Sequence, residues 1–405
     1  MAPPAAQRRL TLNVAPIEVH PDAVIPVGLQ PYDDRRLDGL RNEGRGTYFF
    51  KRFRERDAIA CVSLDDTYRP MGKVEALRCA DAPWLVASLV LEALLKFFHE
   101  NRRPVLGYKP LRIITKQASD ELLRRKPIEG VEIPAWLERR LSYVFDTRTI
   151  YPERTTAQVG LACDVRVANI IRASAAELHE HGVPLIGRYV QVRDQGPDAR
   201  LWPRLRLVGR VASVRGPADD PVLALDDHEE GMPCVRAADA FLEPRQEHVA
   251  ACLRHLFPGH AQELIQRAEA AATALRHGKE QVSRTESLYA ALRARTFELA
   301  PGVPFRLGPL LRNGKPPWFP RGEDLPKPVF VFDPSGSRTS TWHQGGLDAN
   351  GPYDRRTFSP KVPKIAVICQ ARAQGQVEQW LAQFLEGVPS PSSGGQRGSA
   401  GPYEK

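Results

Sequence analysis

The sequence predicts an α+β protein of several domains, in which small antiparallel sheets are joined by helices. Short β-prone runs bounded by Pro and Gly recur over the first half of the chain, and amphipathic helical runs separate them. The chain has 405 residues, and a domain usually holds about 100–200, so two to four domains are expected. Hydrophobic residues make up 42% of the chain, enough for sizeable cores.

Residues 1–100 predict a small sheet with one helix. Thr47–Phe53 and Ala58–Leu64 are β-prone runs on either side of the polar turn RERD, which is typical of a hairpin. Pro83 stands where it can open a helix. One face of that helix is apolar and is therefore predicted to be buried: Leu85, Leu89, Leu94, Leu95 and Phe98.

Residues 101–155 predict a connector. A strand-like run at 105–114 leads to a short helix at 119–126, and a second helix is expected around 135–145, after Pro134. This stretch holds 12 Lys or Arg against 7 Asp or Glu, a net charge of +5. A connector of this charge favours contact with an anionic partner.

From residue 156 the pattern changes to several short strands with one inserted helix. Ser174 caps that helix, and a second helix at 247–257 closes the segment. The strands are expected at 158–167, 185–193, 204–214 and 222–226. Short strands with Pro and Gly turns predict a small β-barrel.

The last part of the chain predicts helices and then the opening of another domain. Helices are expected at 261–277 and 280–295, followed by a Pro- and Gly-rich stretch. A buried strand at 364–370 and a helix at 375–387 are typical of the first unit of a Rossmann-like parallel sheet. One strand and one helix cannot complete such a domain, so only its truncated start is expected.

Charge and cysteine usage favour an intracellular polyanion binder. The net charge is +9 and the sequence pI is about 9.3, which suits nucleic acid or an anionic membrane face. None of the six cysteines forms a C-x-x-C pair, so reduced thiols in a cytoplasm are expected. The N-terminus has no apolar run typical of a signal peptide, and no nucleotide-loop or hydrolase motif occurs.

The segment Val329–Gly387 reads VFVFD, GGLDANGPYDRRTF, PKIAVIC and QGQVEQWLAQFLEGV in order. It resembles the junction between the second linker and the MID domain of long prokaryotic Argonautes. The residues that match the family's run are Gly346, Leu347, Gly351, Pro352, Tyr353, Asp354 and Phe358. Upstream, APWL at 82–85 resembles the start of the N-domain helix, and 155–167 with 177–192 resembles the start of a PAZ domain.

The resemblance implies a layout and a function. In the family, N and PAZ form one lobe of a clamp around a guide–target duplex, MID binds the guide 5′ phosphate, and PIWI carries the cutting carboxylates. The implied layout is an N domain at 1–100, linker 1 at 101–155, a PAZ-like domain at 156–257, linker 2 at 258–359 and an incomplete MID start at 360–405. The implied role is a nucleic-acid-binding lobe that positions strands without cutting.

The implied partners are a guide RNA or DNA, its complementary target and a MID–PIWI half, in the same intact protein or in a second chain. No membrane, catalytic residue, cofactor or metal is expected, and host defence in the prokaryotic cytoplasm is the implied setting. The family's aromatic-rich PAZ insert is not found, which weakens the expectation of guide 3′-end capture. The alternatives are a scaffold that joins a separate MID–PIWI chain and a metal-dependent nuclease using acidic residues near 219–230.

Three basic groups are the candidate contacts to nucleic acid, and for each the alternative is a solvated face. Lys51, Arg52 and Arg54 are interleaved with aromatic residues that can stack on bases. Lys116, Arg124, Arg125 and Lys126 lie in the basic connector.

Arg188, Arg193, Arg204, Arg206 and Arg210 surround the expected barrel. The even spacing of Arg204, Arg206 and Arg210 predicts one strand face, with guanidiniums roughly 7 Å apart along a phosphate backbone.

His248, Cys252 and His255 share a helical face that could hold zinc, although a part-buried thiol beside surface histidines is favoured.

Overall fold

In the computed structural model the chain forms two compact units. One unit holds residues 1–226 and 232–322, and the other holds 227–231 and 323–405. The structure describes residues 12–20, 22–44, 46–108, 110–153, 156–193, 205–217, 219–276, 278–312, 315, 328–351, 366–369, 377, 378, 380 and 381.

The N-terminal part of the larger unit is a four-stranded antiparallel sheet with two helices. The strand order is β3-β4-β2-β5. The elements are β2 (Val24–Pro31), α1 (Asp34–Glu43), β3 (Tyr48–Phe53), β4 (Ala58–Ser63), β5 (Lys73–Arg78) and α2 (Pro83–Glu100). The predicted hairpin is confirmed, since β3 and β4 pair antiparallel across a short 3-10 turn at Arg54–Arg56. The predicted helix is confirmed as α2, and its expected apolar face is buried.

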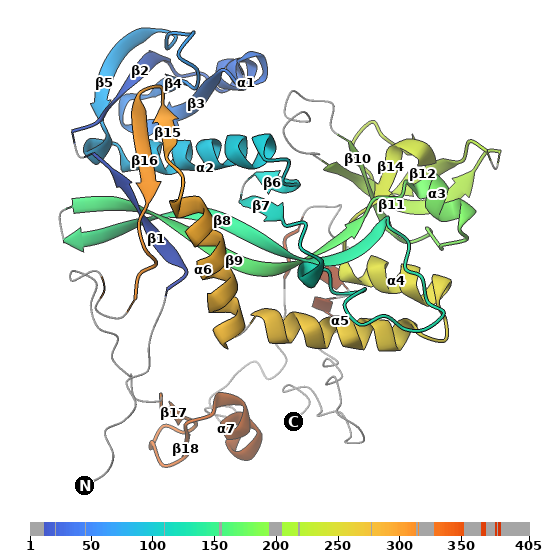
Figure 1. The fold of residues 1–405 in the computed structure, drawn as a ribbon. Helices are drawn as coiled ribbons and strands as arrows, with labels where there is room; N and C mark the ends of the chain where they lie inside the picture. The colour runs from blue at the N-terminus through green and yellow to red at the C-terminus, as the bar shows by residue number, and fades with distance from the viewer. Residues whose placement is uncertain are drawn as a thin grey trace. The chain divides into compact units, whose positions relative to one another are not determined.

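A seven-stranded sheet forms the centre of the same unit. Its order is β15-β16-β1-β9-β8-β7-β6, so the first strand of the chain lies beside strands from its last third. The strands are β1 (Val14–Val19), β6 (Val105–Tyr108), β7 (Leu111–Ile114), β8 (Leu137–Glu153), β9 (Thr156–Ile171), β15 (Phe297–Ala300) and β16 (Val303–Leu307). Helix α2 lies between this sheet and the four-stranded one, and its side chains belong to a core shared with both (Figure 1).

Two helices predicted in the connector are wrong. Residues 137–145 of the expected helix at 135–145 instead begin β8, which pairs with β9, with Leu137 opposite Ile171 and Phe145 opposite Cys163. The alternation that buries Leu137, Leu141 and Phe145 fits a strand, and the long-range partner decides between strand and helix. At 119–126 a 3-10 turn at Ala118–Asp120 is followed by a β-bridge from Glu121 to Arg140. The carboxylates of Asp120 and Glu121 accept hydrogen bonds from the Thr115 hydroxyl and the Arg124 backbone N–H, and such local bonds compete with a helix.

A five-stranded antiparallel sheet follows, in the order β13-β12-β11-β10-β14. Its elements are α3 (Ala175–Glu180), β10 (Tyr189–Arg193), β11 (Leu205–Arg215), β12 (Val222–Asp226), β13 (Cys234–Arg236) and β14 (Ala240–Leu242). Among the described pairings the sheet is open, with β13 and β14 at its edges. The strand expected at 158–167 exists, but it pairs with β8 in the central sheet and not with these strands.

Three helices pack along β9: α4 (Gln246–Leu256), α5 (Ala261–Arg276) and α6 (Gly278–Arg293). They confirm the helices predicted there. Tyr289 of α6 is buried, and its hydroxyl donates to the Leu161 carbonyl oxygen at 2.6 Å. Gly278 opens α6 at φ +60°, a conformation that glycine adopts without strain. No helix in the described part of the chain is both long and apolar enough to cross a bilayer.

The smaller unit has little regular structure among its described residues. It holds β17 (Phe330–Val331), β18 (Thr339–Ser340) and α7 (His343–Asn350). Gly346 and Leu347 of the family-like run lie in α7, whereas 352–358 fall outside the described residues. The buried strand expected at 364–370 is wrong for 366–369, which are irregular and exposed, because a strand is buried only where neighbours pair with it. The described residues of the expected helix at 375–387 are helical.

Candidate nucleic-acid interface

The first basic group divides between the two faces of β3, as alternation requires. Lys51 ties β3 to α2, because its Nζ donates to the Trp84 carbonyl oxygen at 3.1 Å and to Ser88 Oγ. Arg52 points the other way, with its guanidinium 3.8 Å from the Tyr32 ring centroid and 3.1 Å from Asp57 Oδ1. Arg54 is exposed and forms no side-chain bond with a described residue.

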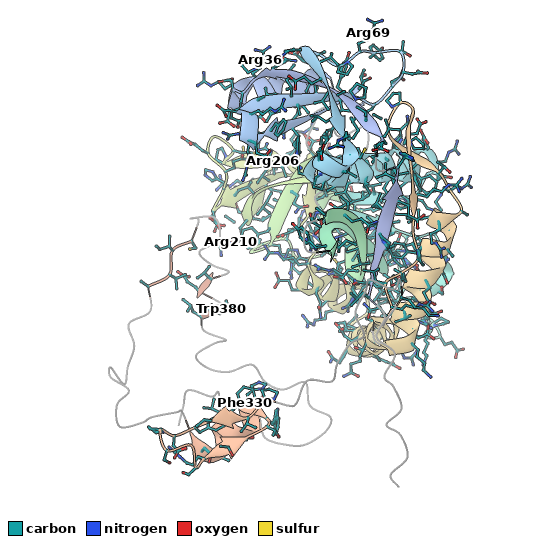
Figure 2. The ribbon with its side chains drawn as sticks, turned by 90° about the vertical axis from the view of Figure 1, so that its left-hand side faces the viewer. Arg36, Arg69, Arg206, Arg210, Phe330 and Trp380 are labelled. Carbon is teal, nitrogen blue, oxygen red and sulfur yellow. The ribbon has the colours of Figure 1, made fainter. Side chains whose placement is uncertain are left out.

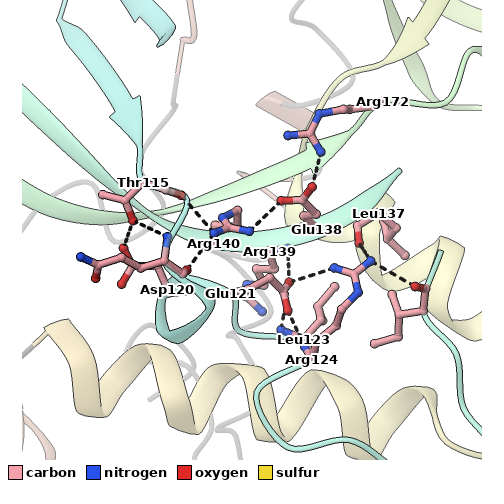
Figure 3. Close-up of polar contacts among 12 residues, drawn as sticks. Thr115, Asp120, Glu121, Leu123, Arg124, Leu137, Glu138, Arg139, Arg140 and Arg172 are labelled. Carbon is pink, nitrogen blue, oxygen red and sulfur yellow. Dashed lines mark hydrogen bonds and ion pairs between the residues drawn. The ribbon is translucent and has the colours of Figure 1, made fainter. Parts of the chain in front are cut away.

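The second group combines one internal cation with three exposed ones. Nη2 of Arg124 donates to the carbonyl oxygens of Ile133 and Leu137, each at 3.1 Å, and to that of Pro134 (Figure 3). This guanidinium therefore fastens the connector loop. The exposed members are Lys116, Arg125 and Lys126, whose side chains have no partner in the described chain.

The third group is largely engaged within the five-stranded sheet. Arg188 Nε donates to the Pro184 carbonyl oxygen at 2.7 Å, and the Arg193 guanidinium lies 4.8 Å from the Phe241 ring centroid. Arg210 binds Asp226 through two nitrogens, at 2.9 and 3.1 Å. Arg206 is exposed, and Arg204 lies outside the described residues.

The expectation that Arg206 and Arg210 share one strand face is wrong. Gln191 pairs with Leu207 but the preceding residue pairs with Gly209, so β11 carries one extra residue at this bulge. Arg206 consequently lies opposite Val192 and Arg210 opposite Tyr189. Those two residues of β10 point to opposite faces because they are three positions apart, and so do the two arginines (Figure 2).

A groove between the end of α2 and α6 gathers cations from three distant segments. It has a volume of about 570 Å³, and we call it the α2–α6 groove. Arg103, Lys116 and Arg295 line it, all three are exposed, and none forms an ion pair or side-chain hydrogen bond within the described chain. Glu280 is the one carboxylate among the described lining residues. Three unpaired cations against one carboxylate leave this wall with a net charge of +2, because the charge of the fourth lining cation, Arg284, is offset by its ion pair with Asp120.

Only Lys116 of these cations was predicted. The arginine that follows α2 and the one that follows α6 lie almost two hundred positions apart in the chain, so no spacing rule brings them together. Both stand just past the C-terminus of a helix, where a cation is commonly placed for the helix dipole. The helix dipole explains each arginine by itself, so the sequence does not predict that the two lie in one groove.

A buried ion pair supports the wall of this groove. Arg284 of α6 lines the groove and pairs through Nη1 with Asp120, whose carboxylate is fully buried. Asp120 also accepts hydrogen bonds from Thr115 Oγ1 and, at 3.4 Å, from the Tyr143 hydroxyl. Burial raises the pKa of Tyr143, so its hydroxyl stays protonated and remains a donor.

A second, larger groove is less suited to a polyanion. Its volume is about 1410 Å³, and it lies between α1, α2 and β15. Four carboxylates line it against three Lys or Arg: Asp38, Glu92, Glu100 and Glu298 against Arg41, Lys96 and Arg295. Phe97, Asn101 and Arg295 line both grooves.

In the described chain, members of the acidic run at 219–230 form ion pairs, and two of the three residues in the His248–Cys252–His255 pattern are buried. Asp226 is bound by Arg210, and Asp220 accepts from Arg236 at 3.0 Å, so two carboxylates of the 219–230 run are held in ion pairs. His248 and Cys252 are buried, and burial raises the pKa of the Cys252 thiol to about 11. Among the described residues no three His, Cys, Asp or Glu side chains are grouped to hold a metal ion.

His248 should make stability depend on pH. Burial lowers its pKa, and its Nδ1–H donates to the Glu243 carbonyl oxygen at 2.7 Å. In the unfolded chain His248 has a pKa of about 6.5. As pH falls below that pKa, the unfolded chain binds a proton at His248 while the folded chain does not, so the free energy of unfolding decreases by up to about 1.4 kcal/mol per pH unit. Urea unfolding at pH 7.5 and 5.5 should show a larger loss for the unchanged protein than for His248→Gln. Equal losses would contradict this expectation.

One curated relative matches most of the chain in sequence. It is the protein argonaute of Cereibacter sphaeroides, 26% identical over 335 residues. The alignment takes in 81% of this chain. The chain is related to the prokaryotic Argonautes. It spans 41% of the length of this Argonaute, and no protein-family model matches it.

Solved structures of Argonautes are also similar to the present chain. One is Clostridium butyricum Argonaute bound to a guide DNA and a 19-mer target DNA, with a TM-score of 0.41, 9% identity, and coverage of 65% of this chain and 40% of that one. Another is A. aeolicus Argonaute, with a TM-score of 0.29, 14% identity, and coverage of 66% and 42%.

Proposed function

We propose that this Argonaute relative binds nucleic acid and that this part of the protein positions guide and target strands without cutting them. The observation that carries the proposal is the α2–α6 groove, where three exposed cations without described partners converge. Cations that line one groove can neutralise phosphates of a strand that enters it and release their counterions. Arg54, Arg125 and Lys126 are exposed cations outside the groove lining and complete the set of proposed contacts.

The proposed layout is an N domain at 1–100, a first linker at 101–155, a PAZ-like domain at 156–257, a second linker at 258–359 and the start of a MID domain at 360–405. The sequence relationship to the Cereibacter sphaeroides protein supports this assignment. The remaining partners in the proposal are a guide RNA or DNA, its target and a MID–PIWI half. The proposed setting is defence against foreign nucleic acid in the prokaryotic cytoplasm.

A second candidate function is a scaffold that joins a separate MID–PIWI chain. The observation that favours it is that the smaller unit exposes several large apolar side chains, which form a surface for a protein partner where they lie together. They are Val329, Val331, Trp342, Val367, Ile368 and Trp380. A scaffold would bind nucleic acid only when the partner chain is present.

A salt titration tests direct binding. A labelled single strand of about 18 nucleotides, as RNA and as DNA, is titrated with the chain in EDTA between about 50 and 300 mM salt. Three or more phosphate contacts predict a slope of log K against log[salt] of about −2 or steeper, since each contact contributes about −0.7. No binding of either strand at the lowest salt would refute direct binding and favour the scaffold.

A further inference from the structure

We propose that the α2–α6 groove holds a short single-stranded segment, of about two nucleotides, with its backbone on the cations and a base against Phe97. The inference rests on the proposed function and names the class of strand for this site. Pockets of roughly 300–1,000 Å³ take ligands of drug size, so a groove of about 570 Å³ takes one or two nucleotides. A duplex must unstack and unpair a base before that base can enter such a groove, at a cost that a single strand does not bear.

The backbone would lie on the three cations. Arg103 follows α2, Lys116 follows β7, and Arg295 follows α6, so the cations approach the groove from three segments. A flexible single strand can adjust its phosphates to cations placed in this way, whereas the phosphates of a duplex have fixed spacing. The planar arginine forks also bind phosphate through two hydrogen bonds.

Lys116 is held in place before any ligand binds. Nη2 of Arg140 donates to the carbonyl oxygens of the residues on either side, Thr115 at 3.0 Å and Gln117 at 2.9 Å (Figure 3). The Thr115 hydroxyl is bound in turn by buried Asp120. The backbone at Lys116 is therefore fixed while its ammonium stays exposed, which lowers the entropy lost on binding.

Phe97 supplies a stacking surface for a base. The ring is half-buried, and its orientation is set by edge contacts to Phe98 and Phe297, with each pair of centroids 5.4 Å apart. Leu288 of α6 lines the groove and is also half-buried. Stacking does not distinguish bases strongly, because every base has a π face, so the site should bind with little sequence preference.

The test compares two double variants of the full chain that remove the same charge. Arg103→Ala/Arg295→Ala changes the groove, and Arg69→Ala/Arg254→Ala removes two exposed cations elsewhere, neither of which has a described side-chain partner. The probes are labelled oligothymidine of about 16 nucleotides and a duplex of equal length. At about 0.1 M salt the groove variant should lose roughly 25-fold in single-strand affinity, with a salt slope shallower by about 1.4. The matched variant should lose less than about 3-fold.

A third variant separates stacking from charge. Phe97→Leu keeps an apolar side chain in the core contact and should lower single-strand affinity at least about 5-fold with an unchanged salt slope. Circular dichroism melting curves of all variants check folding. Duplex affinity should change by less than about 3-fold in the groove variants.

Two outcomes overturn the inference and leave the proposed function standing. One is an equal loss of affinity in the groove variant and in its charge-matched control, which would mean that the whole basic surface binds diffusely. The other is a parallel loss of duplex and single-strand binding in the groove variant. If the unchanged chain binds neither probe at low salt, the proposed function fails and the inference fails with it.

Discussion

Asp120→Ala should lower the free energy of unfolding by about 3–5 kcal/mol. The carboxylate is fully buried and pairs with Arg284, whose side chain is only 15% exposed. Removing the carboxylate leaves a guanidinium without its counter-charge and two hydroxyl groups, those of Thr115 and Tyr143, without their acceptor. Chemical unfolding followed by circular dichroism measures the loss.

A double-mutant cycle identifies the ion pair as the cause. Arg284→Met should also be destabilising, because it leaves the buried carboxylate of Asp120 unpaired. The double variant Asp120→Ala/Arg284→Met should be more stable than the sum of the single losses predicts, with a coupling energy of at least about 2 kcal/mol. A coupling near zero would mean that the two side chains act independently. The single Asp120 variant should also weaken nucleic-acid binding, since it loosens the segment that carries Lys116.

Arg124→Ala should lower the free energy of unfolding by about 2–3 kcal/mol, although the sequence placed this residue among the nucleic-acid contacts. Its guanidinium bonds three carbonyl oxygens of the 133–137 segment and lies 3.5 Å from Glu121 Oε1, itself buried (Figure 3). Truncation leaves those oxygens without a charged donor and the carboxylate without its nearest cation. The salt dependence of nucleic-acid binding should stay the same.

Arg125→Ala is the matched control, because it is the adjacent arginine with an exposed and unpartnered side chain in the described chain. Its stability should change by no more than about 0.5 kcal/mol. Its salt slope should become shallower by about 0.7 if it contacts a phosphate. If Arg124→Ala kept full stability and lost slope instead, the internal role inferred from its hydrogen bonds would be wrong.

Much of the local structure was predictable because short-range signals dominate there. The polar turn between two β-prone runs specified the β3–β4 hairpin, and Pro83 with an apolar stripe specified α2. Residues 135–145 were mispredicted because their apolar spacing fits either element. The strand forms because 163–171, far along the chain, supplies the hydrogen-bonding partner.

The candidate site was predicted less well than the fold. The sequence identifies the basic residues, but it does not show which of their side chains form hydrogen bonds or ion pairs within the fold. Lys51 donates a hydrogen bond to α2, and Arg210 donates two hydrogen bonds to Asp226. The bulge in β11 separated two arginines that even spacing had placed together, because one unpaired residue reverses the alternation of every side chain beyond it.

The sequence by itself determined the basic charge, the local hairpin and helices, and the resemblance to Argonautes that the Cereibacter sphaeroides relative supports. Only the tertiary structure decided which cations are available and that Arg103, Lys116 and Arg295 share one groove. The reason is physical. Local propensity acts over a few residues, whereas the partner of a charged side chain is whichever carboxylate or carbonyl oxygen the fold brings within reach.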